Sequence, residues 1–252
     1  MKTRIIIPAR LASKRLPGKS LADIAGTPMI LRVAQAARSA GFGEPLIAAG
    51  DQEIFDCAKK AGFDVVLTAA DLPSGTDRVQ AALKLSGNTE TTDIVVNLQG
   101  DMPMIEPKTI QAVVEVLQNS PSADIATLVA KITKDEERDN PDVVKAVLSP
   151  LPEKETDTAI KLFRALYFTR TTAPYGDGVL YHHIGIYAYR RQALEKFTKL
   201  KPSMLEKREK LEQLRALENN MQIAVGLVDQ VPQGVDSPQD LEKARALFGD
   251  AQ

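Results

Sequence analysis

The chain has one cysteine, no tryptophan and two histidines among 252 residues, and its formal net charge is -1. One cysteine, Cys57, excludes an intrachain disulfide, and its place in an amphipathic helical pattern predicts a buried structural thiol rather than a nucleophile. The balanced charge gives the whole chain no reason to bind nucleic acid or a membrane surface. Any anion binding must therefore come from a local cluster.

Long hydrophobic runs are absent as well. The apolar run of residues 5–7 is far too short for a signal peptide, and no stretch approaches the ~18 apolar residues of a membrane span. We therefore expect a soluble, cytoplasmic protein.

Short apolar runs alternate with amphipathic helical patterns in the first half of the chain. The runs lack the period-two alternation of a half-exposed strand, which predicts a mostly parallel sheet covered by helices on both faces. Ligands of such sheets bind at the carboxyl ends of the strands. The expected strands are 5–7, 45–50, 63–68 and 93–101, the last almost wholly apolar until Asn97, and the expected helices are 28–41, 51–62, 74–87 and 106–120.

The pattern changes after about residue 135. Two β-like runs surround a charged connection, residues 152–161, which is most simply a solvated loop. The chain continues with a strand at 181–191, a strong helix at 203–220 with a Glu206–Lys210 pair, and a strand at 222–228. The last helix begins after Ser237, with Asp240 completing a capping-box pattern. We expect one α/β domain over residues 1–252, with a smaller β-rich lobe at roughly 136–200.

A basic loop follows the first predicted strand, in the stretch "IPARLASKRLPGK". Small residues let its backbone approach a phosphate chain, and Arg10, Arg15 and Lys19 can neutralise that chain. The two common phosphate motifs, "GxGxxG" and "GxxxxGK[ST]", are absent. By composition alone, a basic surface loop explains the stretch almost as well as a phosphate site does.

Two aspartates stand where a parallel sheet presents its ligands. Asp101 follows the buried run "VVNLQGD", and Asp236 lies between a loop glycine and the last helix. Together they could bind Mg²⁺, which takes one or two carboxylates plus phosphate oxygens and water. From the spacing alone, a turn-capping role for Asp101 and a helix-capping role for Asp236 are favoured.

Three other stretches carry weaker signals. "PSGTDR" opens a helix with free backbone N–H groups that suit an anion or a base edge, although a plain capped helix is the default. His182 and His183 are adjacent in a strand and point to opposite faces, so only one can face a site. "LEKREKLEQLRAL" reads as a solvated charged face, with Gln213 turned inward between Leu211 and Leu214.

Taken in order, these stretches closely resemble the 3-deoxy-manno-octulosonate (KDO) cytidylyltransferases. The resemblance rests on "IPARLASKRLPGK", "PSGTDR", "VNLQGDMPMI", "HIGIYAYR", "REKLEQLRAL" and "GVDSPQDLEKAR", and it spans Ile7 to Arg245. It implies a nucleotide-diphospho-sugar transferase-like fold, a cytoplasmic homodimer, and transfer of CMP from CTP to KDO for lipopolysaccharide synthesis, with Mg²⁺.

The resemblance also implies roles for particular residues. Lys19, Arg15, Asp101 and Asp236 would be catalytic, and the two aspartates would hold Mg²⁺. The nucleotide would be bound by Pro8, Ala9, Arg10, Ser74 and Gly75. The sugar would be bound by Gln99, Arg170, His183, Tyr187, Glu212 and Gln213.

The chain departs from the family's usual spelling at three places. Met102 stands where an acidic residue is usual, and Ala69 and Leu72 stand where Arg and His are usual. The second strand ends "AAGD" rather than "ATD". A different acidic sugar, such as an amino-substituted octulosonate or a sialic acid, therefore stays open, as does a non-catalytic sugar-nucleotide binding protein. A dehydrogenase is disfavoured by the missing "GxGxxG".

Overall fold

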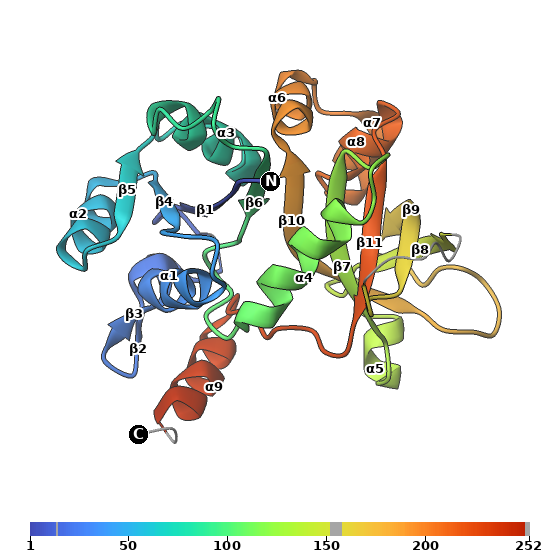
Figure 1. Ribbon diagram of the computed structural model, residues 1–252. Helices are drawn as coiled ribbons and strands as arrows, with labels where there is room; N and C mark the ends of the chain where they lie inside the picture. The colour runs from blue at the N-terminus through green and yellow to red at the C-terminus, as the bar shows by residue number, and fades with distance from the viewer. Residues whose placement is uncertain (14, 152–157, 250–252) are drawn as a thin grey trace. The chain divides into compact units, whose positions relative to one another are not determined.

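The computed structural model describes residues 1–13, 15–151 and 158–249. The chain divides into two compact units. The first contains Met1–Ile110 and Pro232–Gln252, and the second contains Gln111–Val231. In Figure 1 the red C-terminal helix accordingly belongs with the blue and teal elements of the first unit.

The first unit is built on a parallel sheet with the strand order β5-β4-β1-β6. Its strands are β1 (Thr3–Ala9), β4 (Leu46–Ala49), β5 (Asp64–Leu67) and β6 (Ile94–Asn97). The central strand β1 pairs with β4 on one side and β6 on the other, and all three are almost wholly buried. This is what continuous apolar runs without alternation predict. β5 at the edge is more exposed, and Leu67 is 45% exposed.

Helices connect these strands as the sequence predicts. They are α1 (Met29–Ser39), α2 (Gln52–Lys60) and α3 (Gly75–Leu85). The expected apolar face of α1 is fully buried, including Ile30 and Val33. Cys57 on α2 is partly exposed rather than buried, and the burial that remains raises its pKa against the opposing charge of Lys60. The thiol is therefore not activated, as expected.

The C-terminal segment returns to the first unit and packs on its small antiparallel pair. This pair is β2 (Asp23–Ile24) with β3 (Thr27–Pro28), preceded by the 3-10 turn η1 (Lys19–Leu21). The helix α9 (Pro238–Gly249) starts with the predicted capping box. Asp240 N–H donates to Ser237 Oγ at 3.2 Å, and Ser237 N–H donates to Asp240 Oδ2 at 3.0 Å. A buried cluster joins these parts: Ile24, Met29, Val235, Leu241 and Ala244.

The second unit contains a mixed sheet in the order β10-β7-β11-β9-β8, where β10 also pairs with β8. Only β7 and β11 are parallel neighbours. The expectation of a mostly parallel sheet therefore holds in the first unit and not in this one. The strands are β7 (Ile125–Lys131), β8 (Lys145–Pro150), β9 (Leu162–Thr169), β10 (Tyr181–Arg190) and β11 (Ile223–Val228).

Short helices accompany this sheet. They are α4 (Pro107–Gln118), which begins in the first unit, α5 (Asp135–Arg138), α6 (Arg191–Lys199), α7 (Met204–Glu209) and α8 (Leu214–Glu218). The predicted single helix at 203–220 is wrong, because Lys210 adopts the left-handed conformation (φ 57°) and ends α7. The predicted Glu206–Lys210 pair is replaced by a Glu206–Arg215 ion pair at 2.5 Å.

The predicted α/β class, with a sheet flanked by helices, is confirmed. The predicted lobe at 136–200 falls within the second unit, and the prediction of one domain carrying such a lobe stays a prediction. Most of the connection expected to be a solvated loop, residues 152–157, lies outside the described residues.

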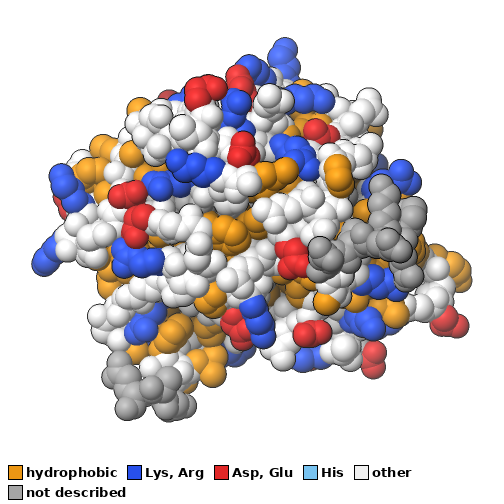
Figure 2. All heavy atoms as spheres, in the orientation of Figure 1, with side chains coloured by type: hydrophobic (Ala, Val, Ile, Leu, Met, Phe, Trp, Pro, Cys, Tyr) orange, Lys and Arg blue, Asp and Glu red, His pale blue; other side chains and the backbone are white. Residues whose placement is uncertain are grey.

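The surface agrees with the balanced composition. In Figure 2, Lys and Arg side chains alternate with Asp and Glu over the described residues on view, and charge of neither sign gathers into one broad patch. None of the described helices is both long and apolar enough to cross a membrane.

Candidate functional site

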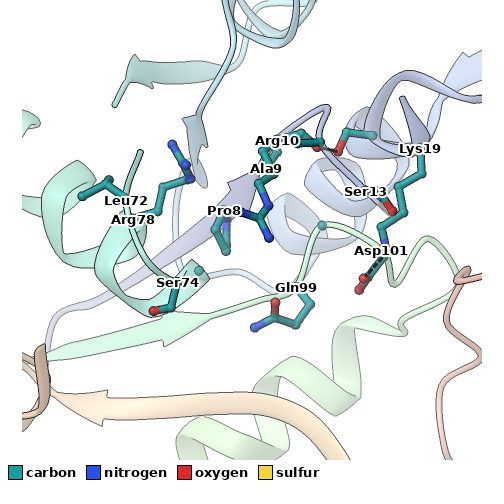
Figure 3. Close-up of a pocket in the computed structure, with 14 residues that line it drawn as sticks. Pro8, Ala9, Arg10, Ser13, Lys19, Leu72, Ser74, Arg78, Gln99 and Asp101 are labelled. Carbon is teal, nitrogen blue, oxygen red and sulfur yellow. Dashed lines mark hydrogen bonds and ion pairs between the residues drawn. The ribbon is translucent and has the colours of Figure 1, made fainter. Parts of the chain in front are cut away.

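A cavity of about 230 Å³ opens in the first unit where β1 and β6 end and α3 begins (Figure 3). Parallel strands present their carboxyl ends at the same edge, which is where such sheets bind ligands. The predicted nucleotide residues meet here, although their positions in the sequence are far apart. The lining residues are Pro8, Ala9, Arg10, Ala12, Ser13, Lys19, Ser20, Leu72, Ser74, Gly75, Arg78, Gln99, Gly100 and Asp101.

The basic loop after β1 is pinned at both ends by hydrogen bonds. At its start, Leu11 N–H donates to Asp51 Oδ2 at 2.7 Å, and Asp51 is separated from the end of β4 by Gly50 alone. At its end, Gly18 N–H donates to Leu11 O at 3.1 Å, and Ser20 Oγ donates to Arg10 O at 3.1 Å. Gly18 has φ 72°, which favours glycine, and this turn directs Lys19 toward the carboxylates.

Lys19 joins the two predicted metal carboxylates. Its Nζ lies 2.7 Å from Asp101 Oδ2 and 3.0 Å from Asp236 Oδ1, and Arg15 Nη2 lies 3.0 Å from Asp236 Oδ2. A backbone hydrogen bond from Val235 to Asp101 O, at 2.8 Å, holds the two segments together. Burial alone would lower the pKa of Lys19, but Asp101 and then Asp236 outweigh it, so the pKa is raised. The structure thus brings Asp101 and Asp236 to one ammonium group, and their assignment to Mg²⁺ stays a prediction.

The residues fit a magnesium ion. Asp101 and Asp236 are both partly exposed, and both direct an oxygen to the single point that the Lys19 ammonium group occupies. Two carboxylates beside an anion cavity are the donor set that Mg²⁺ takes together with phosphate oxygens and water. The described residues contain no cluster of three His, Cys, Asp or Glu side chains, so the pair would need ligands from a bound molecule.

The start of α3 forms another wall of the cavity. Ser74 caps the helix, since Asp77 N–H donates to Ser74 Oγ at 3.1 Å, while that hydroxyl donates to Asp77 Oδ2 at 2.8 Å. The default expectation of a capped helix is thus correct. Because Ser74 and Gly75 also line the cavity, this same cap lies where the predicted base contacts would be.

Gln99 lines the cavity from the loop after β6. Its Nε2 donates to Asn97 Oδ1 at 3.1 Å, and Asn97 Nδ2 donates to Thr76 Oγ1 at 3.3 Å. The chain of hydrogen bonds fixes the amide, so the Gln99 carbonyl oxygen remains for a ligand.

The other five predicted sugar residues lie in the second unit. His183 is 9% exposed, and its Nε2 lies 3.0 Å from Thr127 Oγ1, which donates to Ile186 O at 2.8 Å. The hydroxyl proton is used by that carbonyl, so His183 donates from Nε2 as a neutral ring. Burial, with a smaller contribution from His182, lowers the pKa of His183 to about 3. His182 instead faces Glu137, at 3.3 Å, so the two rings have different surroundings, as predicted.

The Tyr187 ring packs beside His183, and Gln213 has unused hydrogen-bonding capacity within the described part of the chain. The Tyr187 ring lies 5.6 Å from that of His183, and burial raises its pKa well above the usual value. Gln213 is 6% exposed, turned inward as predicted, and its Nε2 has no hydrogen-bond partner among the described residues. Unsatisfied buried donors are costly, which favours a ligand that completes them.

Arg170 and Glu212 are held by neighbouring groups of the second unit. Arg170 Nε donates to Glu209 O at 2.9 Å, and its Nη1 donates to Pro141 O at 2.8 Å. Glu212 Oε1 lies 3.7 Å from Arg215 Nη2. The assignment of these residues and Gln99 to one sugar site stays a prediction.

Two residues at the cavity were missed by the sequence reasoning. Asp51 anchors the basic loop, and Arg78 lines the cavity from the second turn of α3. The aspartate could have been found from its place directly after a predicted strand. An arginine in an amphipathic helix gives no comparable signal, because most such residues face solvent.

Comparison with solved structures first defines the class. A glucose-1-phosphate thymidylyltransferase from Bacillus anthracis, described as putative, shares the fold with a TM-score of 0.64 at 18% identity, covering 98% of this chain and 96% of that one. The fold is that of the nucleotidyltransferases. A structure of CMP:2-keto-3-deoxy-manno-octonic acid synthetase complexed with CTP matches over 100% of both chains, with a TM-score of 0.89 and 35% identity.

Sequence comparison then narrows the class. The family model described as cytidylyltransferase matches residues 4–223. A 3-deoxy-manno-octulosonate cytidylyltransferase from Sinorhizobium medicae is 54% identical over 98% of this chain and 96% of its own length. A 3-deoxy-manno-octulosonate cytidylyltransferase from Parvibaculum lavamentivorans is 56% identical over 97% of this chain and 92% of its own length. The chain belongs to the cytidylyltransferase family, among the 3-deoxy-manno-octulosonate cytidylyltransferases.

Proposed function

We propose that the chain transfers CMP from CTP to the anomeric hydroxyl of KDO, releasing pyrophosphate and giving CMP-KDO for lipopolysaccharide synthesis. The observation that carries the proposal is the meeting of Lys19, Asp101 and Asp236 beside the cavity that the predicted nucleotide residues line. The names of the relatives and the CTP complex of the similar structure support the same substrates.

The reaction makes one bond and breaks one. The anomeric oxygen of the sugar bonds to the α-phosphorus of CTP, the bond from that phosphorus to the bridging oxygen breaks, and pyrophosphate leaves with the electron pair. The hydroxyl proton is lost to solvent or to a leaving oxygen. Such transfers depend mainly on in-line positioning and on neutralising charge, not on a covalent intermediate.

The chain's own residues provide that neutralisation. Arg10, Arg15 and Lys19 would contact the triphosphate, while Pro8, Ala9, Ser74 and Gly75 would surround the cytosine. In the structure Lys19 and Arg15 are paired with carboxylates, so only Arg10 of the three predicted phosphate ligands has no carboxylate in contact among the described residues. Lys19 and Arg15 must exchange partners when the triphosphate binds.

Asp101 and Asp236 would hold Mg²⁺, the predicted cofactor. Bound Mg²⁺ would supply charge neutralisation at the phosphates and could lower the pKa of a coordinated hydroxyl. If Mg²⁺ occupied these carboxylates, Lys19 and Arg15 would be free to turn toward phosphate oxygens. A coordinated hydroxyl with a lowered pKa would make a separate protein base unnecessary.

The predicted sugar residues Gln99, Arg170, His183, Tyr187, Glu212 and Gln213 would bind KDO. The unused donor of Gln213 suits a polyhydroxylated acid. A homodimer in the cytoplasm follows from the resemblance to the family. Size-exclusion chromatography with light scattering tests the dimer, and cell fractionation tests the location.

Pyrophosphate release by the purified chain tests the proposal. The assay uses Mg²⁺ and KDO with CTP, UTP, ATP and GTP in parallel, and mass spectrometry identifies the product. We expect release that depends on KDO and strongly favours CTP. If pyrophosphate were released with an amino-substituted octulosonate or a sialic acid but not with KDO, that sugar would be the substrate in place of KDO. CTP binding without release for any sugar would instead support a non-catalytic binding protein.

A further inference from the structure

Arg78 is a buried cation without a carboxylate partner at the wall of the cavity. The residue is 2% exposed, and no carboxylate of the described residues lies in ion-pair contact with its guanidinium group. Burial, and then the charge of Arg10, lower its pKa, and Asp51 opposes them. Because a guanidinium group stays charged in proteins, a full positive charge is kept there at a cost.

The guanidinium group of Arg78 donates hydrogen bonds to the segment at residues 68–70. Its Nη1 donates to Thr68 Oγ1 and, at 3.1 Å, to Ala69 O, and its Nη2 donates to Ala70 O at 3.4 Å. Thr68 Oγ1 in turn donates to Ala49 O at 2.8 Å. The segment 68–70 leads from β5 to Leu72 and Ser74 at the cavity. Thr68 is held to β4 by its own hydrogen bonds, since its N–H also donates to Ala49 O at 2.8 Å, and Arg78 holds the carbonyl groups of the two residues that follow.

Gly50 completes the arrangement by having no side chain. A Cβ atom at residue 50 would lie 2.7 Å from Arg78 Nη1 and 2.8 Å from its Cζ. The backbone of Gly50 is not in the left-handed region, so its conformation would accept any residue. The guanidinium group of Arg78, and not the backbone, therefore requires glycine here.

We propose that Arg78 is a positioning residue of the nucleotide pocket, whose buried guanidinium group fixes residues 68–70 and so places Leu72 and Ser74, which line the cavity, and that Gly50 is glycine to admit it. The side chains at residues 69 and 70 are methyl groups, so the segment has no polar side chain of its own at those positions. Its path depends on carbonyl groups held by Arg78. The inference rests on the proposed function, since it assigns the cavity to CTP.

CTP binding with Mg²⁺, measured by calorimetry without sugar, tests the proposal in the full chain. Arg78→Lys keeps the charge but cannot reach three acceptors, so we expect the Kd for CTP to rise about tenfold, the loss expected for charge-assisted hydrogen bonds. In the assay, KM for CTP should rise likewise while KM for the sugar stays within about twofold. Gly50→Ala should weaken CTP binding in the same direction.

A double-mutant cycle separates positioning from general damage. If Gly50 acts through Arg78, Gly50→Ala should have no further effect on CTP binding in Arg78→Ala, and additive effects would overturn the proposal. Arg190→Lys is the matched control. Among residues 1–13, 15–151 and 158–249, the Arg190 side chain donates to backbone carbonyls alone, such as Ala123 O at 2.8 Å and Leu117 O at 3.2 Å. Its change should lower the melting temperature without altering CTP binding. Gly249→Ala, where a Cβ meets no atom within 4 Å, controls for the glycine change.

Two outcomes decide against the proposal and differ from failure of the proposed function. Wild-type binding of CTP by Arg78→Lys, with a melting temperature lowered as in Arg190→Lys, would make Arg78 merely structural. Equal increases in KM for CTP and for the sugar would overturn it as well. If the wild-type chain bound no CTP, the proposed function itself would be wrong, whatever the variants showed.

Discussion

The two units use ion pairs in opposite ways. In the first unit, Lys19, Arg15, Asp101 and Asp236 form an open cluster, in which the Asp101 and Asp236 side chains are 31% and 47% exposed. In the second unit, Arg215 and Glu206 form a buried pair, with side chains 7% and 12% exposed. Partners in the open cluster can exchange for ligand groups, whereas those in the buried pair cannot without leaving a charge unpaired.

The contacts around each set show the same difference. Arg215 holds Glu206 through two hydrogen bonds, at 2.5 and 2.9 Å, and lies over the Phe197 ring at 4.8 Å. Glu206 also accepts from Ser203 N–H, which caps α7. Lys19 instead contacts two carboxylates that lie in loops, outside any helix or strand. The buried pair therefore maintains the fold, and the open cluster is built to bind.

Removing a carboxylate of the open cluster should have the largest effect. In Asp101→Asn we expect kcat to fall by about 10²–10³-fold at saturating Mg²⁺, the loss typical of one preorganised electrostatic group. The melting temperature should change little, because Lys19 keeps Asp236. Pyrophosphate release and thermal unfolding measure the two effects. Near-normal turnover would rule out Asp101 as a metal and phosphate residue.

Removing one partner of the buried pair should reverse that pattern. Arg215→Met leaves Glu206 buried without its cation and should lower the free energy of unfolding by about 3 kcal/mol. At saturating KDO, kcat per folded molecule should stay close to normal, whereas KM for KDO should rise because Arg215 also contacts the predicted sugar residue Glu212. Denaturant unfolding beside the assay measures both effects. The control is Lys199→Met, which removes an exposed pair with Glu195 at 2.8 Å and should cost under about 1 kcal/mol. A similar loss in both variants would contradict the comparison.

The residues of the open cluster were named from the sequence through the resemblance to the KDO cytidylyltransferases, and the buried pair was not predicted. The place of Asp101 after a buried strand suggests the ligand edge of a parallel sheet, but spacing alone favoured capping roles for both Asp101 and Asp236. Lys210 is not a glycine, so the sequence does not indicate that it adopts the left-handed conformation. The end of α7 at this residue, which lets Arg215 face Glu206, therefore could not be predicted. Arg78 was missed for a related reason, since its partners are backbone carbonyls that no sequence pattern marks.

The closed character of the second unit should also appear in its response to pH. His183 is neutral and its folded-state pKa is about 3, below the ~6.5 of an unfolded histidine. As pH falls below about 6.5, His183 becomes protonated in the unfolded chain and stays neutral in the folded chain. The folded state therefore loses stability between about pH 6.5 and 3. At pH 5 this histidine should cost about 2 kcal/mol relative to pH 7.5.

Denaturant unfolding of wild type and His183→Gln at several pH values isolates this contribution, because the carboxylates titrate equally in both chains. The amide of glutamine can still donate to Thr127, and it has no proton to gain. His182→Gln is the matched control: burial lowers the pKa of His182, but Glu137 opposes burial, so its part of the pH dependence should be smaller. If the wild-type and His183→Gln curves ran parallel between pH 7.5 and 5, His183 would be accessible to protons in the folded state. The second unit would then be as open at this residue as the first unit is at Lys19.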